Sequence, residues 1–383
     1  MIDDAAAAAL LEWLRAEART LGFSQIGITG VDLREAEPGL LAWLAAGFHG
    51  GMDYMARHGL RRARPAELVP GTLSVLTLRM DYLPRGTPLP PARGTADAGP
   101  DGAPDTPDAP AAPDWRDLEA RRLARPEAAT VSLYARGRDY HKVLRQRLQT
   151  LAERLAARVG PLGHRCFTDS APVLEVELAT RAGLGWRGKH TLALTREAGS
   201  MFFLGEIFLD LALPPPPPLT PHCGSCTACL DACPTGAIVA PGRLDARRCL
   251  SYLSIEHEGP IPPELRRAMG NRIYGCDDCQ LACPWNRHAR RSPLADFDVR
   301  DEFREPTLLQ LWDWTEPEFL ARSEGSAIRR IGYTRWRRNL AVALGNAWHH
   351  TGDAAFARAL TSARESACEL VREHIDWALN QAQ

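Results

Sequence analysis

CGSCTACLDACP, at residues 223–234, and CDDCQLACP, at residues 276–284, are the two stretches that decide how this 383-residue chain is organised. The first has the spacing C-x2-C-x2-C-x3-C-P. The second keeps C-x2-C-x3-C-P but has Ile273 where one more cysteine would complete the pattern. Cys249 lies between them, so eight of the ten cysteines fall within residues 223–283. The second stretch therefore lacks one thiolate, and Cys249 can replace it.

The complete spacing is typical of bacterial ferredoxins, in which three close thiolates hold one [4Fe-4S] cluster and the fourth cysteine reaches the other cluster. A pair of structural zinc sites is the alternative, because zinc sites also use C-x2-C pairs. The x3 spacing and the prolines at 234 and 284 favour two clusters. The predicted ligands are Cys223, Cys226, Cys229 and Cys283 for the first cluster, and Cys233, Cys249, Cys276 and Cys279 for the second.

Length and composition indicate a globular protein of two or three domains. The formal net charge of −1 gives no global sign of nucleic-acid binding, so such a role would rest on local basic patches. No apolar run approaches the ~20 residues that span a bilayer, and the N-terminus has no basic leader. Cysteines spaced as cluster ligands also agree with a reducing compartment. We therefore expect a cytoplasmic protein without membrane contact.

Residues 1–212 alternate between helical and strand-like patterns, which predicts an α/β (α+β) domain on a mixed sheet. Within it, residues 86–114 consist almost entirely of Pro, Ala, Gly, Asp and Thr, which predicts a flexible surface insertion. The expected strands are 25–29, 73–80, 129–134, 166–168, 191–195 and 201–209, and the expected helices are 5–21, 40–44, 52–58, 143–159 and 169–183.

Two further regions follow the proline run at 214–218, which marks the end of the first domain. Residues 213–294 form the ferredoxin-like module with two clusters. Residues 295–383 show no strand pattern, and their two helical hairpins resemble HEAT-type repeats. The helices expected there are 307–322, 326–350, 353–364 and 366–383.

GLGWRG, at residues 183–188, matches the dinucleotide-binding pattern G-x-G-x-x-G by its letters alone. A phosphate-binding turn must follow a strand and open a helix, whereas this stretch follows a predicted helix and precedes a predicted strand. We therefore reject nicotinamide cofactor binding there. The glycines still allow a backbone to approach a ligand closely, with Lys189 and His190 beside them.

Asp169 lies between a predicted strand end and a predicted helix start, where an α/β fold often places functional groups. Burial there would raise its pKa and make it a proton donor. The alternative is that Asp169 or Ser170 only caps the following helix.

A basic stretch at residues 329–338 interleaves arginines with Tyr333 and Trp336, as phosphate contact combined with base stacking requires. A solvated helix face with two buried aromatic residues is the alternative. A second basic stretch, at residues 136–147, is equally ambiguous. Together they make RNA a plausible partner.

Six blocks of sequence, taken in order, resemble the epoxyqueuosine reductase family. The resemblance covers nearly the whole chain, and the 86–114 insertion is its main departure. A complete corrinoid motif, D-x-H-x-x-G, is absent, because Leu144 stands where the glycine should be. The blocks are SLYARGRDYHK at 132–142, DSAP at 169–172, GLGWRGKH at 183–190, REAGS at 196–200, NRIYGCDDCQ at 271–280 and EGSAIRRIG at 324–332.

This resemblance implies reduction of epoxyqueuosine, at the wobble position of tRNA, to queuosine, with cobalamin, two [4Fe-4S] clusters and a low-potential electron donor. It makes Asp169 the proton donor. We also expect the protein to be a monomer. Corrinoid reductive dehalogenases, acting on small molecules, are the alternative family, and a simple electron-transfer protein is a second alternative. The residues implied are Arg62, Tyr134, Asp169, Ala193, Leu204 and Ser251 for the cofactor, and Arg329, Arg330, Arg335 and Arg337 for tRNA.

Overall fold

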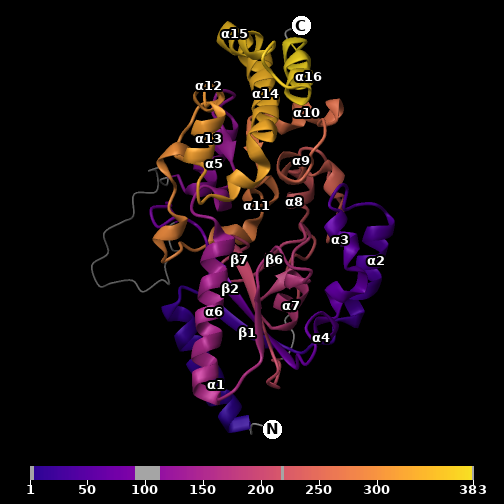
Figure 1. Ribbon diagram of the computed structural model, residues 1–383, viewed down its shortest axis with the longest axis vertical. Coiled ribbons are helices and arrows are strands. Elements are labelled where there is room, and N and C mark those ends of the chain that lie inside the picture. Colours follow the sequence, from indigo (N-terminus) through magenta and orange to yellow (C-terminus); the bar gives the residue numbers. More distant parts are fainter. Residues whose placement is uncertain (1–3, 91–112, 217–219, 382–383) are drawn as a thin grey trace, which may run out of the picture.

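Four strands form the central sheet of the computed structural model, which describes residues 4–90, 113–216 and 220–381 (Figure 1). Their order is β1 (Gln25–Thr29), β2 (Ser74–Asp81), β7 (Phe202–Leu209) and β4 (His164–Phe167). Each neighbouring pair is antiparallel. The mixed sheet expected from the sequence is therefore wrong here, because alternating helices and strands do not show in which direction the chain re-enters the sheet.

Helices cover both faces of this sheet, as an α/β sandwich requires. Leu76 and Leu78 of β2 face the core formed with α1 (Asp4–Thr20) and α6 (Tyr140–Val159). Val75 points to the opposite core. The helices on that side are α2 (Glu37–Ala45), α3 (Asp53–Arg57), α4 (Pro65–Leu68) and α7 (Glu175–Arg181).

Three local predictions for this region need correction. The helix expected over 169–183 begins only at Glu175, because the chain between them makes a tight loop. The strand expected over 129–134 shortens to β3 (Thr130–Val131), which pairs in parallel with β10 (Arg272–Tyr274) of the cysteine module. Most of the expected insertion, residues 91–112, lies outside the described residues, and Asp114 at its end caps the unforeseen helix α5 (Trp115–Leu123).

The cysteine module lies between the sheet and the C-terminal helices (Figure 1). Trp43 Nε1 donates a 2.7 Å hydrogen bond to the Leu244 carbonyl, and Gly51 N donates a 2.6 Å bond to the Tyr252 hydroxyl. These bonds fasten the module to the α2–α3 segment. Its elements are α8 (Ala228–Asp231), β8 (Ile238–Ala240), β9 (Arg243–Leu244), α9 (Leu250–Ile255), α10 (Pro263–Met269), β10 and α11 (Asp278–Leu281).

The chain ends in a helical layer, as the sequence predicts, and residues 295–381 contain no named strand. The helix expected over 307–322 is split in two, because Thr307 and Thr315 each form a capping box that starts a new helix. Side-chain amides of Asn339 and Asn346 bind carbonyls of the module. The helices are α12 (Leu308–Trp312), α13 (Glu316–Arg322), α14 (Gly332–Thr351), α15 (Ala354–Ala363) and α16 (Glu369–Leu379).

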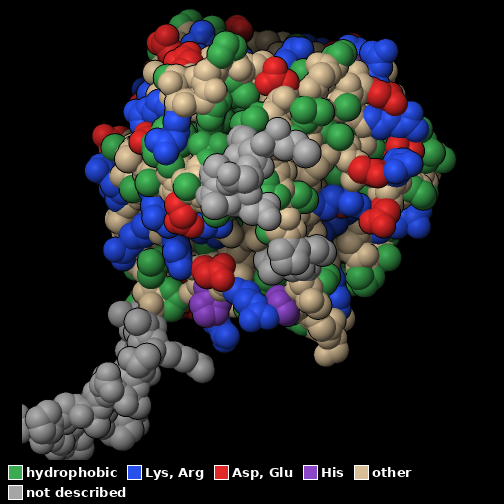
Figure 2. All heavy atoms as spheres, turned by 90° about the horizontal axis from the view of Figure 1, so that it is seen from below, with side chains coloured by type: hydrophobic (Ala, Val, Ile, Leu, Met, Phe, Trp, Pro, Cys, Tyr) green, Lys and Arg blue, Asp and Glu red, His purple; other side chains and the backbone are tan. Residues whose placement is uncertain are grey.

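The two ends of the chain lie at opposite ends of the long axis. Figure 2, a view of the end that carries the N-terminus, shows Lys and Arg side chains interspersed with Asp and Glu. Charges of both signs therefore share this face, in keeping with the net charge of −1. Across the ranges that the structure describes, no helix combines the length and the apolar character that crossing a membrane takes.

Candidate active site between the sheet and the cysteine module

A cavity of about 490 Å³ lies between the sheet domain and the cysteine module. Asp169 and Glu175 of the sheet domain line it, and we call them the acid wall; Cys249 and Cys279 of the cysteine module also line it, and we call them the cysteine wall. Aromatic and aliphatic side chains of β7, including Phe203, line the space between them. Groups for proton transfer and groups for electron transfer therefore face one cavity.

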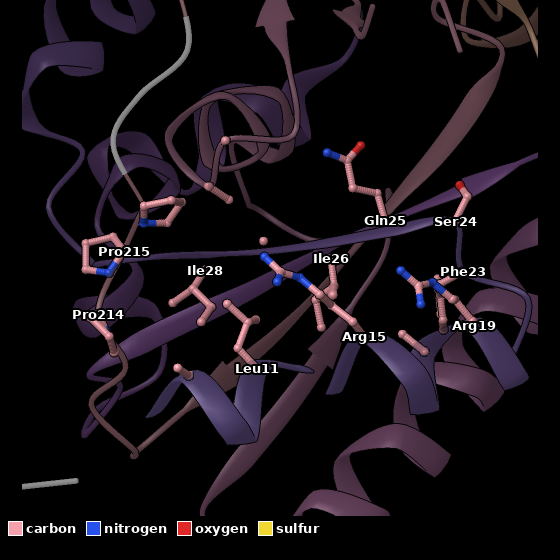
Figure 3. Close-up of a pocket in the computed structure, with 16 residues that line it drawn as sticks. Leu11, Arg15, Arg19, Phe23, Ser24, Gln25, Ile26, Ile28, Pro214 and Pro215 are labelled. Carbon is pink, nitrogen blue, oxygen red and sulfur yellow. The ribbon is translucent and has the colours of Figure 1, made fainter. Parts of the chain in front are cut away.

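A second cavity, of about 530 Å³, lies beside the edge strand β1. Figure 3 shows Arg15 and Arg19 of α1 near Ile26 of β1, with Pro214 and Pro215 nearby. No cysteine, histidine or carboxyl group is among the described residues that line it. We therefore place the candidate active site in the first cavity.

Two groups of thiols can be distinguished among the cysteines. Burial raises the pKa of Cys283 to about 11, and Cys229 and Cys223 are near enough for their charges to contribute. Burial also raises the pKa of Cys249, with a contribution from Cys233. In the described ranges no three Cys, His, Asp or Glu side chains converge as ligands of a single metal ion. These neighbours fit the cluster ligands expected from the sequence, and that assignment stays a prediction.

The GLGWRG stretch connects the sheet domain to the first cysteine group. As predicted, it follows a helix, α7, and enters a strand, β5 (Trp186–Arg187), which pairs with β6 (Ala193–Leu194). Trp186 Nε1 donates a hydrogen bond to Cys223 Sγ at 3.4 Å. Lys189 Nζ donates to the carbonyls of Gly224 and Cys226 at 2.7 and 2.8 Å. The GLGWRG stretch and Lys189 therefore hold the first cysteine loop in place, and the stretch has this structural role instead of forming a nucleotide-binding turn.

Asp169 occupies a strained loop directly after β4. Its φ is 51°, a left-handed conformation that non-glycine residues rarely adopt. Its backbone N–H donates to Glu175 Oε1 at 2.5 Å, and Thr168 Oγ1 donates to the Leu204 carbonyl at 2.9 Å. The capping role considered for Asp169 is wrong, because the first residue of α7 is six positions later and its N-cap, Leu174, makes no side-chain cap.

The Asp169 carboxylate is held by two residues from the first turn of α6. Tyr140 Oη donates a hydrogen bond to Asp169 Oδ2, and His141 Nε2 lies 2.9 Å from the same oxygen. The other ring nitrogen of His141 lies 2.8 Å from Asp139 Oδ1. The imidazole therefore bridges two carboxylates.

This bridge places the proton on His141. Burial would lower the pKa of His141, but its contacts with Asp139 and Asp169 raise it to about 9. Burial would raise the pKa of Asp169, but the hydrogen bonds from His141 and Tyr140 outweigh it and lower that pKa. The raised Asp169 pKa expected from the sequence is therefore wrong, because these donors stabilise the carboxylate. Asp169 and His141 together hold one proton at neutral pH.

The residues implied as cofactor contacts are only partly brought together. Tyr134, Ala193, Leu204 and Ser251 line the cavity. Arg62 does not, and its guanidinium donates to the carbonyls of Met55 and Tyr54. His190 also lines the cavity, and its buried Nε2 has no hydrogen-bond partner in the described part of the chain.

The arginine stretch at 329–338 does not form one continuous surface. Arg329 is exposed, and Arg330 lines the cavity while pairing with Glu256 at 2.8 Å. Arg335 donates to the carbonyls of three residues, and Arg337 stacks on the Trp312 ring at 3.4 Å.

Two further residues of this stretch, Arg338 and Trp336, are fully buried, and Tyr333 is half-buried. The sequence also allowed the alternative that the aromatic residues of this stretch are buried, and this alternative holds for Trp336.

Sequence reasoning missed Tyr140 and His141 as site residues, and it missed Glu175. Tyr140 and His141 meet Asp169 only through the packing of α6 beside β4, 28 or more positions away in the sequence. A local signal was present, because Asp139 caps α6 and so fixes the direction of the two rings that follow it.

Comparisons with known proteins agree on one family. Residues 222–286 match the model of a 4Fe-4S double cluster binding domain, and residues 111–170 match the model described as Epoxyqueuosine reductase QueG, DUF1730. The epoxyqueuosine reductase of Alicycliphilus denitrificans is 63% identical over 368 residues, which cover 95% of this chain and 96% of that protein.

Two solved structures have closely similar folds. One is an epoxyqueuosine reductase with an epoxyqueuosine-modified tRNA-Tyr stem loop, with a TM-score of 0.77 and 27% identity over 98% of this chain and 99% of that one. The other is the Bacillus subtilis enzyme with its aspartate catalytic loop swung out of the active site, with a TM-score of 0.77 and 26% identity over 98% and 100% of the two chains.

Proposed function

The chain belongs to the epoxyqueuosine reductase family, and we propose that it reduces the epoxide of epoxyqueuosine in tRNA to the alkene of queuosine. The observation that carries this proposal is the cavity whose two walls hold an acid group and cysteines of a 4Fe-4S double cluster domain. Loss of an epoxide oxygen as water consumes two electrons and two protons, so both walls are needed. Electrons would come from a low-potential donor through the two clusters.

Cobalamin is the cofactor that we propose for this cavity, and the residues present fit it. The space is bounded by the second cysteine group on one side and by Asp169 on the other. Tyr134, Ala193, Leu204 and Ser251 would hold the corrin, and the unpartnered His190 Nε2 offers a buried polar atom. When bound, cobalamin supplies a low-potential cobalt centre for reductive cleavage of the carbon–oxygen bond.

The residues of the chain supply the proton and the shape of the site. Asp169 and His141 share one proton, which rests on His141 Nε2 beside Asp169 Oδ2 and can pass through that oxygen to the departing oxygen of the substrate. Tyr140 fixes the carboxylate from the side, and it stacks on Phe203 with ring centroids 4.2 Å apart. The rings also exclude water from the reacting atoms.

For tRNA binding, we propose contacts from Arg329 and Arg330. Arg330 lies where the helical layer meets the cavity. A nucleotide whose phosphate binds there would have its base at the opening of the cavity. Arg335 and Arg337 contribute less, because backbone carbonyls already engage their donors. We keep as further proposals the HEAT-like origin of these helices, the domain limits 1–212, 213–294 and 295–383, a monomeric state and a cytoplasmic location.

One assay tests the proposed function. The purified, iron-loaded protein is given cobalamin, a low-potential reductant and an anticodon stem loop that contains epoxyqueuosine, and the nucleosides are analysed by mass spectrometry. We expect queuosine to appear, with a mass 16 Da lower than the substrate, about one oxygen atom. A reaction without cobalamin serves as the control. Unchanged epoxyqueuosine with fully loaded protein would refute the proposal.

A further inference from the structure

Glu206 is a carboxyl group in the middle of the central sheet, on β7. Its side chain is completely buried, and neither carboxyl oxygen has a hydrogen-bond partner in the described residues. The residues in register on the neighbouring strands, Thr77 and Phe167, carry no charge. A carboxylate in such a place needs a proton or a cation.

The group that meets Glu206 is another carboxyl. Glu175, the first residue of α7, lies near enough for its charge to raise the pKa of Glu206, and it also lines the cavity. Two ionised carboxylates repel each other and offer no hydrogen, so their proximity favours a proton on at least one of them. Glu175 therefore connects a buried acid to the wall that holds Asp169.

The electrostatic surroundings keep a proton on this pair at neutral pH. Burial raises the pKa of Glu175 to about 8, and the negative charge of Asp169 adds to the shift. Burial also raises the pKa of Glu206 far above its ordinary value. The other groups that face the pair are Tyr140, Arg62 and His141, and His141 is already paired with Asp169.

We propose that Glu175 and Glu206 share a proton and form the store from which the second proton of the reduction is drawn. This inference rests on the proposed function. The balanced reaction takes the epoxide, two electrons from the reductant and two protons, breaks both carbon–oxygen bonds, and forms an alkene and water. The first proton leaves the Asp169–His141 pair. The second leaves Glu175 as the oxygen becomes water, and Glu175 then remains as a carboxylate until solvent reprotonates it.

The count of proton-holding groups supports this assignment. Two carboxyl-containing pairs, Asp169 with His141 and Glu175 with Glu206, each retain at least one proton near pH 7, and the reaction needs two protons. Glu175 accepts the Asp169 backbone N–H at 2.5 Å, so the two pairs are in direct contact. The sheet has no structural need for a carboxyl at position 206, since an apolar residue of the same size would pack there without loss of hydration.

Substitution by glutamine tests the role of the proton without changing shape. We expect Glu175→Gln to slow single-turnover conversion about 100-fold at pH 8, because an amide cannot supply the proton. Glu206→Gln removes a neighbour that lowers the pKa of Glu175, while burial and the charge of Asp169 still raise it, so the alkaline loss of rate should move from about pH 8 to higher pH. The matched control is Glu177→Gln, on the same helix, where the carboxylate pairs with Arg181. It should retain the wild-type rate and pH profile.

Infrared difference spectra give a readout that does not depend on turnover. A protonated carboxyl band should be present at pH 7 in the wild type and in the control, and it should be weaker in Glu206→Gln. If the wild type shows no such band, or if both glutamine variants convert substrate within twofold of the wild type with unchanged pH profiles, the inference fails although the proposed function stands. If the wild type itself converts nothing, the proposed function fails first. If Glu206→Gln does not fold, the infrared band of the wild type and the conversion rate of Glu175→Gln still test the inference.

Discussion

The two walls of the cavity are built in different ways. The cysteine wall comes from short loops whose thiols follow one another along the chain, and Cys233, Cys249 and Cys283 are the predicted ligands that join from a distance. The acid wall carries Tyr140 from α6, Asp169 from a loop and Glu175 from α7, with His141 and Glu206 behind them. Local spacing therefore defines one wall, and tertiary packing defines the other.

This difference predicts different responses to substitution. Four thiolates share one cluster, so the loss of one ligand removes the whole cluster and with it the electron path. The acid wall holds its protons on two separate pairs, so a single substitution there removes one proton source and leaves the fold and the clusters intact. Substitutions can test this contrast, beginning with the largest effect.

Cys249→Ala should have the largest effect. With one ligand of the second cluster gone, iron should fall from about eight to about four atoms per chain, and turnover should fall to the detection limit of the assay. Iron analysis and electron paramagnetic resonance measure this. Cys368→Ala, an exposed cysteine outside both groups, is the control and should retain all iron. A full complement of iron in Cys249→Ala would show that another residue completes the second cluster.

Asp169→Asn should leave iron and cobalamin binding unchanged but lower turnover by about 10²–10⁴-fold, because the amide cannot pass a proton to the departing oxygen. Ser170→Ala, in the same loop, is the control. The measurement is single-turnover conversion of the modified stem loop, with iron content determined on the same samples. Undiminished conversion would remove Asp169 from the acid role.

The contrast also explains how far the sequence alone could lead. The spacing of the cysteines was sufficient to predict two groups of ligands, because cluster geometry requires thiolates at short, fixed intervals. The strands β1, β2 and β7 were visible for a similar reason, since each is a short, mostly apolar run of the length that a buried strand has. Strand direction and the start of α7 were not visible, because they depend on how the chain turns between elements.

The acid wall was less accessible to sequence reasoning. Asp169 could be singled out, but its lowered pKa arises from His141, which only the packing of α6 brings near. Glu206 left a signal that went unused. It is the only charged residue in the strand FFLGEIFL, and a charged residue in a fully buried strand needs an explanation. The arginine stretch misled in the opposite way, because its pattern does not show that Arg338 points into the core.

His141→Asn should give an intermediate effect and a shift in pH dependence. His141 keeps the proton of its pair up to about pH 9, so the wild-type rate should be sustained through neutral pH. Without the imidazole, Asp169 must carry the proton itself, and a carboxyl without this partner is protonated only at acidic pH. We expect roughly tenfold lower turnover at pH 7 that recovers as the pH is lowered. An unchanged pH profile would separate His141 from the proton pair.

Trp186→Phe should have the smallest effect, and it tests whether the properties of the first cluster depend on the cysteine loops alone or also on the sheet domain. The indole N–H of Trp186 donates to Cys223 from the sheet domain, across the boundary of the module. Such a bond stabilises the more negative, reduced cluster, so its loss should lower the reduction potential of the first cluster. If the bond contributes on the order of 1 kcal/mol, the shift is on the order of 40 mV, and turnover should change only a few-fold.

A redox titration followed by electron paramagnetic resonance measures that shift, and Trp285→Phe is the matched control. Trp285 packs edge-on against Trp186, with ring centroids 5.1 Å apart, but in the described structure it donates no hydrogen bond to a cysteine. Removing either indole changes ring volume equally, so a shift in Trp186→Phe alone isolates the N–H···S bond. Equal shifts in both variants would mean that ring packing sets the potential, and no shift in either would mean that the cysteine loops alone do. Only a shift confined to Trp186→Phe would show that the sheet domain, which holds the proton donors, also sets the reduction potential of the cluster.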